Sequence, residues 1–249
     1  MIICLGQQPC GFLPKRFLVA KLLTARRVQQ EAGGRLVLFY HDSDHDHRET
    51  RTSLRDAQGR LEHLNFAVAD KLERKYTPLY LKTIAAGWQE KMARRLPRFA
   101  PELVDLFLSV QATRVADFCL EMYQGLGLLD GVEVVRSSDP AVRRAAVRVS
   151  DYYADLPYQG RVVRARAGPG GYRLHQGGES YLQVRAENVD PEQISPTRDS
   201  RLVWMQSVIG CTHYVAGVSE MVYLDRAQTP AITFVERDFV ADAALAWTG

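Results

Sequence analysis

Apolar positions at the start of the chain form two short runs that flank an amphipathic stretch. Residues 1–5 and residues 35–40 are both apolar runs of the kind that forms buried strands. Between them, apolar side chains recur every three or four positions over residues 17–32, which is the spacing of a helix, and Gly33-Gly34 follow as a left-handed C-cap. The order strand, helix, strand predicts a right-handed βαβ unit with parallel strands.

The remainder of the chain divides into a helical middle, a glycine-punctuated β segment and a return to the core. Apolar spacing predicts mainly helices over residues 66–130, a strand that ends near residue 135, and a further helix over 141–153. Glycine clusters separate short alternating runs over 161–185, which predicts a small antiparallel meander. Three segments are expected to rejoin the core sheet: 203–209, 214–216 and 231–235.

Together these elements predict an α/β fold with a Rossmann-like parallel-sheet core that carries inserted helical and small β segments. We assign residues 1–65 to the first part of the core and residues 66–193 to a helical and small β insertion that continues it. Residues 194–249 form its C-terminal part. With 249 residues, the chain is long enough to bury a sizeable core.

Composition and charge exclude several classes of protein. The chain has 32 basic and 29 acidic residues and a formal net charge of +3, without a basic run. This balance argues against binding of nucleic acid or of a membrane surface. The four cysteines show no zinc-binding spacing, and neither a signal sequence nor a membrane-spanning run is evident, so we expect a cytoplasmic protein with buried thiols.

The first candidate site is the loop Gly6-Gln7-Gln8-Pro9-Cys10-Gly11, which lies between the first predicted strand and the first predicted helix. In an open parallel sheet such a loop lies at the carboxyl end of a strand, where ligands bind. Free amides at the start of the helix suit a phosphate or a carboxylate, and the two glutamines add donors and acceptors. The alternative is an ordinary turn with solvated glutamines.

The second candidate site is the charged run of residues 41–49, which directly follows the second predicted strand and reaches the same edge of the sheet. Titratable groups packed this closely shift one another's pKa values, as acid–base chemistry requires, and Asp44, His45 and Asp46 stand at its centre. The same run could be a hydrated loop. A third reading is a metal-dependent hydrolase built on His41, His45 and His47, because imidazoles and carboxylates also hold divalent metals.

In order and spacing these motifs resemble the cysteine-adding enzymes of bacillithiol biosynthesis (the BshC family). That family has a Gly-Gln-Gln loop, a lysine in the next helix, and an Asp-His-Asp run with an acidic residue three positions later. A later family segment runs from Ser-Pro through an arginine to a glycine, a glutamate and a tyrosine. The matching residues are Gly6, Gln7, Gln8, Lys21, Asp44, His45, Asp46, Glu49, Ser195, Pro196, Arg201, Gly217, Glu220, Tyr223 and Arg237.

The resemblance implies a nucleotidyltransferase- or HUP-type core and an ATP-dependent ligase that joins the carboxyl group of cysteine to an amino-sugar conjugate. Asp44, His45 and Asp46 would orient Mg²⁺ or exchange protons with the attacking amine. Lys21 and Arg201 would neutralise anionic charge. The remaining matched residues would bind nucleotide or substrate: Gly6, Gln7, Gln8, Glu49, Gly217, Glu220 and Tyr223.

The sequence also departs from the family. Cys10 replaces a glycine, Ser43 an acidic residue and Met205 a glutamine, and the family's C-terminal helical coiled-coil half has no counterpart. The resemblance therefore implies a shortened form without the family's usual means of dimerising. A partner protein or a homo-oligomer could supply the missing contacts. The alternative function is a non-catalytic or partner-dependent ligand-binding core.

Overall fold

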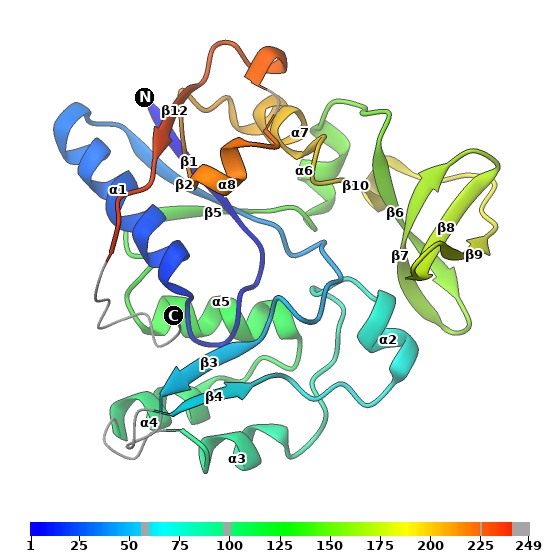
Figure 1. The fold of residues 1–249 in the computed structure, drawn as a ribbon, viewed down its shortest axis with the longest axis horizontal. Coiled ribbons are helices and arrows are strands. Elements are labelled where there is room, and N and C mark those ends of the chain that lie inside the picture. The colour runs from blue at the N-terminus through cyan, green and yellow to red at the C-terminus, as the bar shows by residue number, and fades with distance from the viewer. Residues whose placement is uncertain (56–59, 97–100, 225, 241–249) are drawn as a thin grey trace.

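The computed structural model of the protein describes residues 1–55, 60–96, 101–224 and 226–240 (Figure 1). Its centre is a parallel sheet of five strands in the order β12-β11-β1-β2-β5. Numbered by their order in the chain and read from β5, these strands run 3-2-1-4-5, so the sequence order reverses at β1. The strands are β1 (Ile2–Gln7), β2 (Arg35–Tyr40), β5 (Val132–Arg136), β11 (His213–Ala216) and β12 (Thr233–Glu236).

The βαβ prediction is confirmed by the pairing of the first two strands. Helix α1 (Arg16–Ala32) connects β1 to β2, and the two strands pair in parallel along their full length. Gly33 ends the helix with a positive φ of 73°, and its N–H donates to the carbonyl of Gln29. Its ψ of −173° lies outside the left-handed helical region, so the predicted cap is wrong in its geometry although right in its position.

Both faces of the parallel sheet are buried, which explains why its central strands are continuous apolar runs. Alternate residues of each strand contact two different clusters. Leu5 and Leu38 pack with α1 and α5 (Val115–Gly125) on one face. Cys4, Val37 and Phe39 pack on the other face against α7 (Arg201–Ile209).

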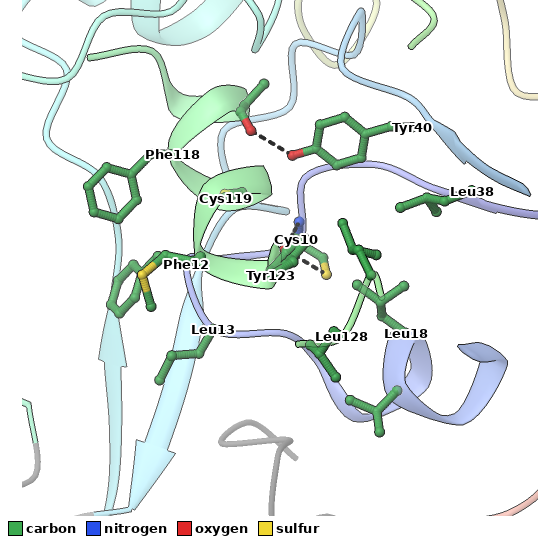
Figure 2. Packing of buried hydrophobic residues seen from close by; sticks show 14 of the residues in the cluster. Cys10, Phe12, Leu13, Leu18, Leu38, Tyr40, Phe118, Cys119, Tyr123 and Leu128 are labelled. Atoms are coloured by element: carbon green, nitrogen blue, oxygen red, sulfur yellow. Dashed lines mark hydrogen bonds between the residues drawn. The ribbon is translucent and has the colours of Figure 1, made fainter. Parts of the chain in front are cut away.

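The loop that follows β1 is anchored to α5 by one tyrosine (Figure 2). The Tyr123 hydroxyl accepts a hydrogen bond from the Cys10 N–H at 3.2 Å and donates to the Gly11 carbonyl at 2.7 Å. Burial raises the pKa of the Cys10 thiol, which therefore stays protonated. The first candidate loop is thus fixed at its far end by the core.

The middle of the chain is helical, as predicted, with one addition. It contains α2 (Lys71–Tyr76), α3 (Trp88–Ala93), α4 (Pro101–Ser109) and α5. An antiparallel hairpin of β3 (Thr52–Arg55) and β4 (Leu61–Leu64) precedes these helices and was not predicted. A cluster of aromatic rings joins this region to the loop after β1: Phe12, Phe66, Trp88, Phe107 and Phe118.

A second, antiparallel sheet lies to one side of the parallel sheet (Figure 1) and confirms the predicted meander. It is larger than predicted, with the order β10-β6-β7-β8-β9. Its strands are β6 (Tyr152–Tyr158), β7 (Arg161–Gly168), β8 (Gly171–Gly177), β9 (Ser180–Val184) and β10 (Ile194–Pro196), the last preceded by a short 3₁₀ turn, η1 (Pro191–Gln193).

The predicted helix over 141–153 is wrong in its second half. Helix α6 covers only Pro140–Ala145, capped by the Asp139 side chain, and Ala146 already has an extended backbone. Tyr152 and Tyr153 instead begin β6, where Tyr153 pairs with Arg166. Aromatic side chains favour a strand, and the partner strand β7 supplies the backbone hydrogen bonds.

The three C-terminal segments all return to the core. The first forms α7 on one face of the parallel sheet, and the other two form β11 and β12. Between these strands lie α8 (Val218–Met221) and a 3₁₀ turn, η2 (Arg226–Gln228). In the part of the chain that the structure describes, no helix is long and apolar enough to cross a membrane.

A buried ion pair connects the two sheets. Arg143 of α6 lies 2.7 Å from the Asp155 carboxylate of β6, and both side chains are at most 5% exposed. The Tyr80 hydroxyl donates to the same carboxylate at 2.8 Å, and Arg143 Nε donates to the Ser137 carbonyl. The antiparallel sheet is therefore joined to the edge of the parallel sheet by a desolvated charge pair.

We predict that Asp155→Ala lowers the free energy of unfolding by about 3–5 kcal/mol, because it leaves the Arg143 guanidinium buried without its counter-ion. The matched control is Glu133→Ala, which breaks the exposed pair with Arg35 and should cost about 1 kcal/mol or less. Urea unfolding followed by circular dichroism measures both. Equal losses in the two variants would contradict this account of the connection.

Candidate functional site

The candidate site lies at the carboxyl edge of the parallel sheet, where the strand order reverses between β1 and β11. Loops on either side of such a reversal diverge and leave a crevice that binds ligands. A pocket of about 200 Å³ lies there, and we call it the switch-point pocket. It is lined by all nine residues predicted to bind nucleotide or substrate: Gly6, Gln7, Gln8, Lys21, Glu49, Arg201, Gly217, Glu220 and Tyr223.

A larger cleft of about 970 Å³ adjoins this pocket, and we call it the basic cleft. It lies between the loop after β2, helix α2, the antiparallel sheet and the start of α7. The three residues predicted to be catalytic, Asp44, His45 and Asp46, line the basic cleft. The two cavities are neighbours, since they share four lining residues: Gln8, Glu49, Arg201 and Tyr223.

Two glycines of the switch-point pocket leave no room for a side chain. A Cβ atom at Gly6 would lie 2.5 Å from the Tyr214 hydroxyl oxygen, and one at Gly217 would lie 2.9 Å from Arg237 Nε. Any larger residue would clash with these polar side chains unless they moved. The glycines therefore make room for the Tyr214 and Arg237 side chains at the ends of β1 and β11.

Lys21 and Glu220 form a buried ion pair beneath the switch-point pocket. The Lys21 ammonium lies 2.5 Å from Glu220 Oε2 and donates to the Gly6 carbonyl at 2.9 Å. The Tyr214 hydroxyl donates to the other Glu220 oxygen at 3.0 Å. Burial lowers the pKa of Lys21, and the Glu220 carboxylate opposes this shift. The structure thus brings the two residues together as partners. Each side chain therefore already uses part of its hydrogen-bonding capacity within the protein.

Asp44 is held as an ionised carboxylate inside the loop after β2. Its Oδ1 accepts hydrogen bonds from its own loop's N–H groups, those of His45 at 2.5 Å and Asp46 at 3.0 Å. Burial would raise the pKa of Asp44, but the Arg164 guanidinium and these contacts overcome it and lower the pKa to about 2. Asp44 therefore orders the loop and supplies a fixed negative charge.

His45 is neutral at physiological pH. Burial is the main cause that lowers its pKa to about 4; the Asp44 carboxylate opposes the shift and the Arg164 guanidinium adds to it. Arg164 reaches the ring from β7, with its terminal NH1 donating to His45 Nδ1 at 3.5 Å. The loop after β2 thus meets the antiparallel sheet at this imidazole.

Asp46 and Glu49, the other predicted acids of this run, are paired with neighbouring cations. Arg48 binds Asp46 through two nitrogens, at 3.0 and 2.7 Å, and lowers the pKa of that carboxyl. Glu49 lies 3.6 Å from the Lys15 ammonium and remains 44% exposed. Of the two, only Glu49 also lines the switch-point pocket.

The three histidines do not act together. The Nε2 atom of His47 is bonded to the Phe66 carbonyl, while that of His41 is buried against the end of β1 without a partner. Within the described ranges, no three histidine, cysteine or acidic side chains lie close enough to hold a metal ion. The hydrolase reading therefore finds no support in this part of the chain.

Sequence reasoning missed the basic residues that dominate the cleft. Among the described residues that line it, seven are lysines or arginines and three are acids. The acids are the partners of cations already described, so the cleft keeps excess positive charge and suits an anionic ligand. The missed cations are Arg48, Lys71, Arg74, Lys75, Arg164 and Arg198.

Arg164, and the nearby Lys82 that does not line the cleft, could have been found only with the fold known. Arg164 alternates with apolar residues in β7, which is the pattern of a solvent-facing position, yet it is buried. Lys82 is fully buried and donates to the His45 and Arg74 carbonyls, and burial lowers its pKa to about 8. Nothing in the local pattern distinguishes either from an ordinary surface cation.

Arg201 is the predicted cation that remains available. It begins α7 and lines both cavities. Across the described part of the chain it has no ion pair and no hydrogen bond from its guanidinium. A free guanidinium at the junction of two cavities is well placed to bind a phosphate or a carboxylate.

No family model matches the chain, and no curated protein matches it either.

We predict that the protein loses stability as the pH falls from about 6.5 to about 4. Burial lowers the pKa of His41, His45 and His47, so the unfolded chain binds more protons than the folded one in this range. Between about pH 7 and pH 5 the loss should be roughly 1–2 kcal/mol for each histidine. Urea unfolding at several pH values measures it.

The matched variants are His47→Gln and His63→Gln. The first removes one of the buried histidines and should flatten the pH dependence by about a third. The second changes an exposed ring that is hydrogen-bonded to Ser53, and should leave the dependence as it is. A wild-type protein equally stable at both ends of the range would show this description of the histidines to be wrong.

Proposed function

We propose that the protein binds a nucleoside triphosphate and joins a carboxyl group to an amine, in the manner of the cysteine-adding enzymes that its sequence resembles. The observation that carries this proposal is the convergence of the matched residues. They are scattered from residue 6 to residue 223, and all nine proposed binding residues line one pocket at the reversal of the strand order. The parallel core would then be of the nucleotidyltransferase or HUP type.

The charge of the basic cleft supports an anionic ligand such as ATP. Its cations outnumber its acids, and the first turn of α1 contributes Phe17 to the adjoining pocket. ATP with Mg²⁺ would supply the driving force that a carboxylate needs to react with an amine. Arg201 would bind a phosphate, and Tyr223, stacked against Arg198, would flank the nucleotide.

The switch-point pocket offers carboxylates for the amino group of a substrate. Glu49 and Glu220 both line it, and Glu220 is held in place by Lys21 and Tyr214. In the proposed reaction Glu220 and Tyr223 bind the amino end of cysteine. Lys21 orients Glu220 and the end of β1, rather than neutralising the anionic charge of a ligand as the resemblance implies.

The room in the basic cleft supports a second substrate. Pockets for small ligands range from about 300 to 1,000 Å³, and this cleft is at the upper end. We propose an amino-sugar conjugate as the acceptor of the cysteinyl group, in a cytoplasmic protein that acts alone, as a homo-oligomer or with a partner chain. The alternative, a ligand-binding core without catalysis, predicts binding without turnover.

We predict that Mg·ATP binds the wild-type protein with micromolar affinity in a calorimetric titration. Arg201→Ala should weaken binding about tenfold or more, because it removes a charge-assisted hydrogen bond worth about 1.5–3 kcal/mol. Arg35→Ala is the matched control: Arg35 is an exposed arginine at the opposite end of β2, paired with Glu133, and should bind as wild type.

Turnover separates the ligase from a binding module. With Mg·ATP, cysteine and an amino-sugar acceptor, the ligase proposal requires a new amide, detected by mass spectrometry, and Glu220→Gln should raise the KM for cysteine. Binding without any product would favour the non-catalytic core. Failure of the wild-type protein to bind any nucleotide would contradict the proposal for this chain acting alone.

A further inference from the structure

Arg164 is a buried cation that contacts the loop after β2 from the other sheet. It belongs to β7, is 7% exposed, and lies over the Tyr153 ring at 3.8 Å from the centroid. Its guanidinium is held from behind by β10, with Nε donating to the Ser195 hydroxyl at 3.2 Å and NH2 to the Pro196 carbonyl at 2.8 Å. The Ser-Pro motif of the sequence therefore fixes the orientation of Arg164.

The third nitrogen of this guanidinium, NH1, determines what the His45 ring can do. NH1 donates to His45 Nδ1 at 3.5 Å. Arginine carries donors only, so the nitrogen that faces it must present a lone pair. The single proton of the neutral imidazole then lies on Nε2.

The competing partner of Nδ1 is the Asp44 carboxylate, which would favour the opposite form. Asp44 Oδ1 lies 3.7 Å from Nδ1, beyond hydrogen-bond distance, and already accepts from the His45 and Asp46 N–H groups. The same oxygen lies 3.8 Å from Arg164 NH1. The geometry therefore favours Arg164 as the partner of Nδ1.

The other ring nitrogen is available to a ligand. His45 Nε2 has no hydrogen-bond partner among the residues described, and the ring lines the basic cleft with its side chain 27% exposed. A ring nitrogen that carries a proton in a cleft with excess positive charge can donate to an anion, but it cannot accept a proton from an amine.

We propose that Arg164 is a positioning residue that holds His45 in its Nε2–H form, so that the ring presents a hydrogen-bond donor to an anionic oxygen of the ligand in the basic cleft. The inference rests on the proposed function only for the identity of that ligand. It assigns to His45 the role of a donor and not of a general base. It also explains why a residue of the antiparallel sheet is needed at this site.

The test is the protonation state of the His45 ring, observed by long-range ¹H–¹⁵N correlation spectra of the labelled protein at neutral pH. His45→Gln assigns the signals. We expect the Nε2–H form in wild type and a shift towards the Nδ1–H form in Arg164→Gln, because Asp44 becomes the nearest partner of Nδ1. Arg164→Lys, which keeps a cationic donor, should retain the Nε2–H form.

The matched control is Arg166→Gln, two positions along the same strand, whose guanidinium pairs with Asp151 and contacts neither Asp44 nor His45. It should leave the ring as in wild type. A wild-type ring in the Nδ1–H form, or an Arg164→Gln ring that keeps Nε2–H, would overturn the proposal. The wild-type spectrum alone shows which ring nitrogen of His45 carries the proton, so this part of the test holds even where a variant fails to fold.

Ligand binding provides a second readout that separates this proposal from the proposed function. Mg·ATP should shift the Nε2–H signal of wild type, and its affinity should be about tenfold lower in Arg164→Gln than in Arg166→Gln. Inorganic tripolyphosphate, which lacks the nucleoside, tests whether an anion alone produces the shift. An Nε2–H ring whose signal neither probe moves would overturn the donor role, whereas a response to tripolyphosphate alone would contradict only the choice of ATP.

Discussion

The parallel pairing of β1 with β2 on one side and β11 on the other is the constraint on which the rest of the site depends. Parallel strands end at a common edge, so three loops far apart in the sequence must meet there. Because the strand order reverses at β1, two of these loops diverge and leave the switch-point pocket, which Gly6 and Gly217 line. Position in the sheet, and not any one side chain, makes this edge the candidate site.

Buried charge is the second organising feature, and each instance joins elements that are distant in the chain. Arg143 with Asp155 connects the two sheets, Lys21 with Glu220 joins α1 to α8, and Arg164 joins β7 to the loop after β2. A charge out of water is costly unless partners fix it, so these groups admit few arrangements. The contacts of Arg143 and Arg164 specify how the antiparallel sheet lies against the core, and with it the shape of the cleft.

The sequence predicts those parts of the fold that depend on local pattern. Continuous apolar runs predicted β1 and β2. The spacing of apolar residues at three and four positions predicted α1, because one face of this helix is buried. The pairing of Lys21 with Glu220 was not predictable, because both were assigned to a ligand and only the strand order brings them together. The overextended helix after residue 141 failed because strand pairing outweighed the local helical pattern. Arg164 was not predicted as a site residue. The alternation of polar and apolar residues along a strand does not show which face of that strand the rest of the protein covers.

The hydrogen bonds of Tyr123 to Cys10 and Gly11 have a thermodynamic consequence for recognition. They tie the end of the loop after β1 to a rigid helix before any ligand arrives, so this segment has little conformational entropy left to lose on binding. More of the interaction energy then remains as affinity, as in other preorganised sites. Such a loop favours a fixed shape of ligand, and tolerance for varied substrates would have to come from the wider cleft beside it.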